Sequence, residues 1–174
     1  MVKQYIKSFK DFPVDGVDFK DTASLCASVD GFREANDEFY AELLQYMPVD
    51  KIIGIDARGF IFGSVLAYRT GTPLVLARKM GKLPGSTIAK EFNLEYGTAT
   101  LEIQRDSITK GESVIIIDDL MATGGTMNAV VEMVEELGAH TVAVACLMDL
   151  SFLPGGDSIR DKGIPFYAVT TYYY

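Results

Sequence analysis

The chain has 174 residues, which corresponds to about one domain of ordinary size. Its composition is 48% apolar and 23% charged, which excludes a disordered, a collagen-like and a disulfide-scaffold protein. The 24 acidic residues outnumber the 16 basic ones and give a net charge of −8. An acidic chain disfavours general binding to nucleic acid and to an anionic membrane.

Few residues are available for metal or nucleophilic chemistry. Cys26 and Cys146 lie far apart in the sequence, so we expect free thiols in a reducing compartment. The one histidine, His140, disfavours a zinc cluster and a Ser-His-Asp triad. The N-terminus lacks the apolar run of a secretory signal, and the longest near-apolar run, 142–148, is shorter than the ~20 residues that span a bilayer. We therefore expect a cytoplasmic protein with no nucleic-acid or membrane partner.

The N-terminal third predicts two helices. Tyr5, Ile6 and Phe9 suggest a short amphipathic helix, which the turn-rich loop 11–16 follows. Asp30 is placed to cap a longer helix that ends before Pro48. The apolar residues of this helix recur every three or four positions: Phe32, Ala35, Phe39, Leu43 and Tyr46.

The middle of the chain predicts strands and helices in alternation. Residues 51–56 form a short buried strand, 58–70 a helix with Gly71 as its C-terminal cap, and 73–77 a second strand. Residues 81–98 show no clean period and predict a long loop, which in a compact domain is often a functional lid.

The C-terminal part continues this alternation. Residues 114–117 give the strongest strand signal, followed by a helix over 126–137 and strands over 141–148 and 164–169. Uninterrupted apolar strands between amphipathic helices indicate a parallel sheet covered on both faces. The fold class is therefore α/β.

The segment 114–126 carries the clearest functional signal. Two adjacent acids, Asp118 and Asp119, end the strand, and a loop of small residues leads into a helix. Gly124 and Gly125 allow backbone N–H groups to approach an anion, and the helix N-terminus favours negative charge there. Phosphate donors beside two acceptors that suit a vicinal diol predict a ribose phosphate site. The simpler alternative is a tight turn with solvated acids; Walker A and Gly-x-Gly-x-x-Gly patterns do not match.

This segment resembles the phosphoribosyl-diphosphate (PRPP) binding motif of the type I phosphoribosyltransferases. Its form over 122–127, Ala-Thr-Gly-Gly-Thr-Met, is similar to that of the adenine-specific branch. Three further stretches are similar to the pyrophosphate loop, the basic segment and the mobile catalytic loop of that branch, namely 56–63, 78–85, and 94–97 together with 101–104.

The resemblance covers roughly residues 11–150 and implies a type I phosphoribosyltransferase fold. That fold has a central parallel sheet flanked by helices, a small N-terminal hood and a mobile catalytic loop. We expect one domain over 1–174, with the hood and base-binding segment at about 1–35 and the mobile loop at about 86–99.

The same resemblance implies where PRPP binds. The phosphate and the ribose are expected to bind to Asp118, Asp119, Ala122, Thr123, Gly124, Gly125 and Thr126. The pyrophosphate is expected to bind to Ala57, Arg58, Gly59, Arg78, Lys79 and Lys82. For the last three residues the alternative is a solvated basic loop. The resemblance also predicts a cis peptide between Asp56 and Ala57, Mg²⁺ held mainly by PRPP without a direct protein ligand, and a homodimer in which some basic side chains reach the neighbouring site.

For the base and the chemistry, the resemblance implies that Phe19 stacks on a purine whose edge is read by backbone groups of Asp18 and Lys20. Phe19 as an ordinary core residue is the alternative. Glu95 would assist proton transfer at the base, with Arg58 as the other catalytic residue, and Tyr96 would help to order the closed loop. Around this segment the chain departs from the family pattern, which usually has an apolar residue at 18, Arg at 20 and Ile-Thr-Pro-Leu in place of 22–25.

The implied reaction converts adenine and PRPP to AMP and pyrophosphate, with inversion at the anomeric carbon. Transfer to xanthine, hypoxanthine or guanine is the alternative within the class. A PRPP-sensing regulator without catalysis is the alternative outside it, and it would need a basic face or an added DNA-binding domain. A catalytically inactive relative is disfavoured by the presence of Asp118, Asp119, Arg58 and Glu95.

Overall fold

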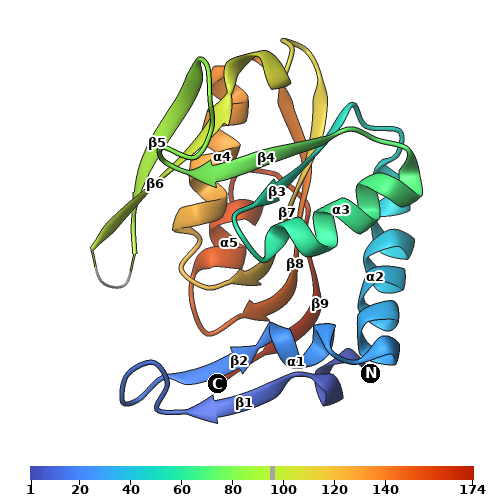
Figure 1. Cartoon of the computed structure of the whole chain (residues 1–174), viewed down its shortest axis with the longest axis vertical. Helices are drawn as coiled ribbons and strands as arrows, with labels where there is room; N and C mark the ends of the chain where they lie inside the picture. The colour runs from blue at the N-terminus through green and yellow to red at the C-terminus, as the bar shows by residue number, and fades with distance from the viewer. Residues whose placement is uncertain (95–96) are drawn as a thin grey trace.

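We describe a computed structural model of the chain over residues 1–94 and 97–174. Its helices and strands alternate along the chain (Figure 1). Their bounds are β1 (Lys7–Lys10), β2 (Asp18–Asp21), α1 (Thr22–Cys26), α2 (Val29–Leu43), β3 (Lys51–Ile55), α3 (Gly59–Thr70), β4 (Leu74–Lys79), β5 (Thr87–Asn93), β6 (Thr98–Gln104), β7 (Ser113–Met121), α4 (Gly125–Glu136), β8 (His140–Leu150), α5 (Gly155–Arg160) and β9 (Phe166–Tyr172).

The larger sheet has seven strands in the order β5-β6-β4-β3-β7-β8-β9. The five strands from β4 to β9 in this order run parallel, whereas β6 is antiparallel to β4 and β5 is antiparallel to β6. Because β3 and β7 are neighbours and parallel, their carboxyl ends meet at one edge of the sheet. The α/β class and the central parallel sheet are therefore confirmed, with an antiparallel hairpin added at one end.

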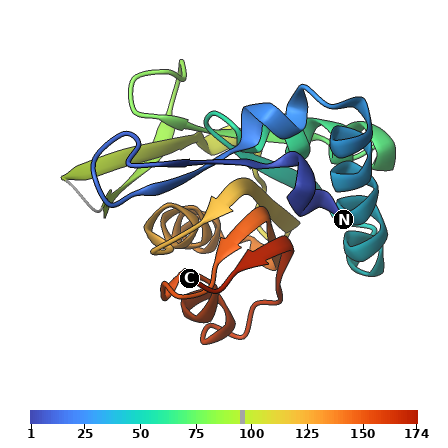
Figure 2. The same cartoon turned by 90° about the horizontal axis from the view of Figure 1, so that it is seen from below.

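Helices cover both faces of this sheet (Figures 1 and 2), and an apolar cluster lies on each face. On one face α2 and α3 bring Phe39 and Phe62 together, with ring centroids 5.5 Å apart. On the other face α4 buries Val130 and Val134 completely. Burial of such side chains contributes roughly 1.5–3 kcal/mol each, so the two layers hold the strand ends in place.

The hood is a two-stranded antiparallel sheet of β1 and β2, followed by α1. It lies across the end of the larger sheet at which β8 and β9 finish, close to the C-terminus (Figures 1 and 2). Gly71, with φ +66°, caps α3 as predicted, because a left-handed residue there lets the chain leave the helix.

Three predicted elements are wrong in type or boundary. Residues 2–5 form a 3₁₀ turn and Phe9 belongs to β1, so the predicted amphipathic helix is absent from this described segment. Ser28, whose hydroxyl accepts from the Gly31 N–H, caps α2 in place of Asp30. The predicted loop over 81–98 is a loop only in its first part, since Thr87–Asn93 forms β5 and pairs with β6. Within the described residues, no helix is both long and apolar enough to span a membrane.

Candidate active site

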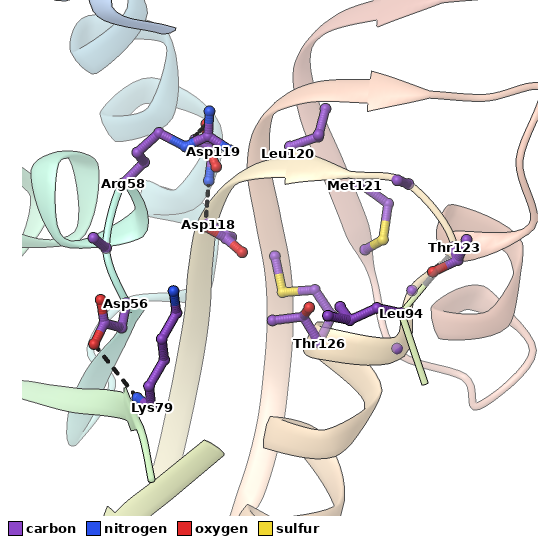
Figure 3. Close-up of a pocket in the computed structure, with 15 residues that line it drawn as sticks. Asp56, Arg58, Lys79, Leu94, Asp118, Asp119, Leu120, Met121, Thr123 and Thr126 are labelled. Atoms are coloured by element: carbon purple, nitrogen blue, oxygen red, sulfur yellow. Dashed lines mark hydrogen bonds and ion pairs between the residues drawn. The ribbon is translucent and has the colours of Figure 1, made fainter. Parts of the chain in front are cut away.

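A cavity of about 420 Å³ opens at the carboxyl ends of β3 and β7 (Figure 3). Its walls come from the β3–α3 turn, the end of β4 and the whole β7–α4 connection. The lining residues are Asp56, Ala57, Arg58, Lys79, Leu94, Asp118, Asp119, Leu120, Met121, Ala122, Thr123, Gly124, Gly125, Thr126 and Met127. Ten of the residues that the sequence predicts for PRPP are in this list, so segments far apart in the chain meet as expected.

Contacts with residues of α4 and α5 fix the position of the loop 122–126. Gly124, with φ +89°, is the N-cap of α4, and a Cβ there would lie 2.8 Å from the Gly155 Cα. The Asn128 amide donates to the Gly124 carbonyl at 2.9 Å and to the Ser158 hydroxyl at 2.8 Å. These contacts orient the first N–H groups of α4 toward the cavity, which is the geometry that binds a phosphate.

The two acids of the motif have different surroundings. Asp119 is 3% exposed, and its Oδ2 accepts from the Arg58 Nε at 2.9 Å and from the Thr22 hydroxyl at 2.6 Å. Asp118 is partly exposed in the cavity, and its Oδ1 accepts from the Asp119 N–H at 2.8 Å. Burial, and then the neighbouring Asp119 carboxylate, raise the pKa of Asp118 well above its usual range. Asp118 is thus the carboxylate open to a ligand.

The β3–α3 turn supplies the cationic side of the cavity. The Asp56–Ala57 peptide is cis, as predicted. Arg58 precedes the first residue of α3, so its guanidinium and the helix N-terminus lie at one edge of the cavity. Gly59 stands behind this edge, where a Cβ would lie 2.7 Å from the Ile117 carbonyl. A glycine therefore allows α3 to approach β7 closely, and Gly59 lies outside the cavity wall that the structure describes.

The basic segment reaches the cavity with one side chain. Lys79 lines it, and its backbone N–H donates to the Asp56 carboxylate at 3.4 Å (Figure 3). Arg78 donates to the same carboxylate at 3.3 Å and to the Lys82 carbonyl at 3.4 Å. Arg78 and the exposed Lys82 lie outside the described walls of the cavity, so only Lys79 of the three predicted residues of the basic segment lines it.

The hood residues lie beside the cavity on two faces of β2. Asp18 and Lys20 line a second cavity of about 500 Å³, which shares Thr123 with the first. Phe19, between them in the strand, projects the other way, and its ring packs edge-on against Phe12 at 5.1 Å. The Arg58 guanidinium carbon lies 6.0 Å from the centre of the Phe19 ring. Phe19 therefore faces the cationic side of the first cavity.

Glu95 and Tyr96 lie outside the described residues, and so do the roles predicted for them. The residue before them, Leu94, lines the first cavity. Across 1–94 and 97–174, the side chains form no cluster of three or more histidines, cysteines or acids that could hold a metal ion.

Sequence reasoning missed three residues that hold the site together. Asp56 binds Arg78, Thr22 binds Asp119, and Glu102 accepts from the N–H groups of Lys82 and Leu83 at 3.1 and 3.0 Å. Asp56 directly follows β3 and is the first residue of the stretch 56–63 that resembles the pyrophosphate loop, which is a local signal for it. Glu102 lies within the recognised stretch 101–104, but neither its contacts nor those of Thr22 leave a local signal, because the partners are distant in sequence.

Comparison with known proteins agrees with this geometry. A family model described as "Phosphoribosyl transferase domain" matches residues 30–160. Adenine phosphoribosyltransferase of Geobacter metallireducens is 47% identical over 160 residues, which are 92% of this chain and 93% of the relative. The enzyme of the same name from Butyrivibrio fibrisolvens is 45% identical over 159 residues, 91% of this chain and 88% of the relative.

Solved structures agree as well. Adenine phosphoribosyltransferase of Thermoanaerobacter pseudethanolicus superposes with a TM-score of 0.90 at 38% identity, covering 98% of each chain. The Saccharomyces cerevisiae enzyme, solved in complex with an imino-altritol bisphosphate and adenine, superposes with a TM-score of 0.89 at 34% identity, covering 97% of this chain and 96% of the yeast one. The chain therefore belongs to the phosphoribosyltransferase family and, within it, to the adenine phosphoribosyltransferases.

Proposed function

We propose that this chain makes AMP and pyrophosphate from adenine and PRPP with the residues that line the first cavity. The observation that carries the proposal is that Arg58, Asp118 and the phosphate loop 122–126 share one cavity. A cation binds pyrophosphate, a carboxylate accepts hydrogen bonds from the ribose hydroxyls, and backbone N–H donors bind a phosphate monoester.

The 5-phosphate binds in the loop from Ala122 to Thr126. Its oxygens accept from the free N–H groups at the start of α4 and from the hydroxyls of Thr123 and Thr126, while the helix dipole favours the negative charge. Asp118 accepts from the ribose hydroxyls. Asp119, already engaged by Arg58 and Thr22, holds the surrounding groups in position.

The pyrophosphate lies at the start of α3, against Ala57, Arg58 and Lys79, where developing negative charge is stabilised. Gly59 contributes by letting the helix approach. PRPP arrives with Mg²⁺ held mainly by its own oxygens, which suits an ion that prefers substrate phosphates and water. When bound, this ion supplies further charge neutralisation for the departing pyrophosphate.

Adenine lies against Phe19, and backbone groups of Asp18 and Lys20 read its edge. As the bond between the anomeric carbon and the pyrophosphate oxygen breaks, the purine nitrogen forms the new bond from the opposite face. The proton of that nitrogen passes to Glu95, and Tyr96 orders the segment that excludes water. The electron pair of the broken bond leaves with pyrophosphate, so the product is AMP.

The assembly that fits this chemistry is a homodimer in the cytoplasm. Arg78 and Lys82 lie outside the described walls of their own cavity, and the exposed apolar side chains of Tyr68 on α3 and Leu76 on β4 lie on neighbouring elements. In a dimer these basic residues would be available to the neighbouring subunit's site.

A base panel tests the proposal. Purified protein, Mg²⁺ and PRPP are incubated separately with adenine, hypoxanthine, guanine, xanthine and orotate, and nucleotides are separated by chromatography. AMP as the single product supports adenine transfer. Another nucleotide would move base specificity to the segment around Phe19, and binding of PRPP without any nucleotide would favour the sensor.

The role of the stacking ring needs a variant of its own. Phe19→Ala should raise the KM for adenine about tenfold, because an aromatic stack on a base contributes on the order of 1–3 kcal/mol. The KM for PRPP should change much less. Phe19→Tyr, which keeps the aromatic ring, is the matched control and should leave both constants nearer to wild type.

A further inference from the structure

The second acid of the motif joins the hood to the PRPP cavity. Its carboxylate, on Asp119 at the end of β7, accepts from the hydroxyl of Thr22 at 2.6 Å, and these residues are 97 positions apart. Both side chains are buried, with 1% of Thr22 and 3% of Asp119 exposed. A charge-assisted hydrogen bond that water does not reach is among the stronger kinds in proteins.

The hood holds Thr22 firmly at this place. Thr22 is the first residue of α1, and the Asp21 side chain caps that helix by accepting from the N–H groups of Ala23 and Ser24, both at 3.0 Å. The Ser24 hydroxyl in turn donates to the Tyr5 carbonyl at 2.9 Å. The position of the Thr22 hydroxyl is therefore set by the hood itself.

The same carboxylate oxygen orients Arg58. The Arg58 Nε lies 2.9 Å from Asp119 Oδ2, while the arginine side chain remains 43% exposed at the cavity. The guanidinium carbon of Arg58 also lies 6.0 Å from the centre of the Phe19 ring. Two residues of the hood that are three positions apart therefore lie close to the Arg58–Asp119 pair, Thr22 at the carboxylate and Phe19 at the guanidinium.

We propose that Thr22 is a positioning residue for the PRPP site, whose hydroxyl fixes Asp119 and through it the guanidinium of Arg58. This inference rests on the proposed function, in which Arg58 meets the pyrophosphate. The hood then has two roles. It holds the base through Phe19, and it sets the orientation of Arg58, the cation that stabilises the leaving pyrophosphate.

Thr22→Val and Thr22→Ser separate the hydroxyl from the shape of the side chain. Valine keeps the branched shape without a donor, and serine keeps the donor. We expect Thr22→Val to weaken PRPP binding about tenfold, measured as the Kd for Mg–PRPP by calorimetry, because a hydrogen bond to a charged group is lost. Thr22→Ser should stay within about twofold of wild type.

Thr141→Val is the matched control for losing a threonine hydroxyl. The Thr141 hydroxyl is buried without a hydrogen-bond partner among the described residues and belongs to the start of β8, away from the cavity. We expect this variant to bind Mg–PRPP like wild type. Melting curves of all three variants report any loss of folded protein separately from the loss of affinity.

A double-mutant cycle with Arg58→Ala tests the connection between the two residues. If Thr22 acts through Arg58, Thr22→Val should have little further effect on the Kd in the Arg58→Ala background. Equal Kd values for wild type and Thr22→Val, or additive effects of the two changes, would overturn the inference. Because the readout is PRPP binding, a failure of the base panel would be seen separately and would refute only the proposed reaction.

Discussion

At the scale of single residues, the adjacent acids Asp118 and Asp119 have different roles because their surroundings differ. Asp119 is buried and accepts from Thr22 and Arg58, whereas Asp118 faces the cavity. Burial and the charge of Asp119 raise the pKa of Asp118. The ionised form of this open carboxyl group is therefore disfavoured in the free protein, and a ligand that donates hydrogen bonds to it favours that form.

We predict that Asp118→Asn makes the protein more stable near neutral pH and a weaker binder of PRPP. In the unfolded chain Asp118 ionises near pH 3.9. Because its pKa is raised in the folded protein, its ionisation costs the folded state stability as pH rises above that value. Asparagine cannot ionise and escapes this loss. An increase of ~1 kcal/mol corresponds to about 2–4 °C in Tm for a chain of this size.

Melting curves at several pH values check this sign. The difference in Tm between Asp118→Asn and wild type should be present at pH 7–8 and vanish near pH 3, where the aspartic acid is protonated in both states. A variant that is less stable than wild type at pH 8 would show that Asp118 makes a stabilising contact as a charged group. Calorimetry with Mg–PRPP provides the second reading, a loss of affinity.

At the scale of elements, the β5–β6 hairpin positions the basic segment. Glu102 on β6 is 5% exposed and accepts from the N–H groups of Lys82 and Leu83 and from the Thr87 hydroxyl at 3.3 Å. These hydrogen bonds lower the pKa of Glu102, and the bond from the Leu83 N–H has the largest effect. Burial acts in the opposite direction and raises the pKa. One carboxylate thus holds the turn that follows Lys79.

We predict that Glu102→Gln lowers the free energy of unfolding at pH 7 by about 1–2 kcal/mol, because charge-assisted hydrogen bonds become neutral ones. A lowered pKa means that this stabilisation is fully present above the unfolded-state pKa of about 4.3 and is lost as pH falls through the folded-state pKa. Urea unfolding at pH 7 and pH 3 should show a larger difference between Glu102→Gln and wild type at pH 7 than at pH 3.

The same variant should affect the site in a selective way. Movement of the turn displaces Lys79, so the KM for PRPP should rise by more than the KM for adenine. Glu91→Gln, on the exposed side of the neighbouring strand β5, is the control and should behave like wild type in both assays. Equal changes in the two KM values for Glu102→Gln would contradict a specific role in the basic segment.

At the scale of the whole molecule, the C-terminal edge strand anchors the N-terminal hood. The ring of Tyr172 on β9 lies under two ammonium groups, with Lys3 Nζ at 4.2 Å and Lys20 Nζ at 4.7 Å from its centre. The Lys20 amine also donates to the Ser8 hydroxyl at 2.9 Å and to the Asp18 carboxylate at 2.6 Å. The two ends of the chain thereby fix the strand that carries Phe19.

We predict that Tyr172→Ala raises the KM for adenine several-fold, since the hood loses a packed ring and two cation–π contacts of about 0.5–2 kcal/mol each. Tyr172→Phe keeps the ring face and should remain close to wild type. Steady-state kinetics with each substrate varied in turn gives both constants. An equal loss in the alanine and phenylalanine variants would place the effect in the hydroxyl and refute the anchoring role of the ring.

The sequence by itself determined the parts whose signals are local. Four apolar residues, two acids and a run of small residues predict the strand, turn and helix of 113–136, because each step obeys short-range preferences of the backbone. The cavity lining from Asp118 to Thr126 follows from that one stretch, and the cis peptide at Asp56–Ala57 followed from resemblance.

Tertiary structure decided the contacts that connect such stretches. The sequence over 87–93 predicts a loop because its apolar and polar residues alternate only weakly. The strand forms there because β5 pairs with β6. The bonds from Thr22 to Asp119 and from Glu102 to the basic segment leave no mark on the residues around them, since a hydrogen bond between distant positions imposes no period on the sequence. Only the packed fold brings these partners together, and with them the hood, the cations and the phosphate loop.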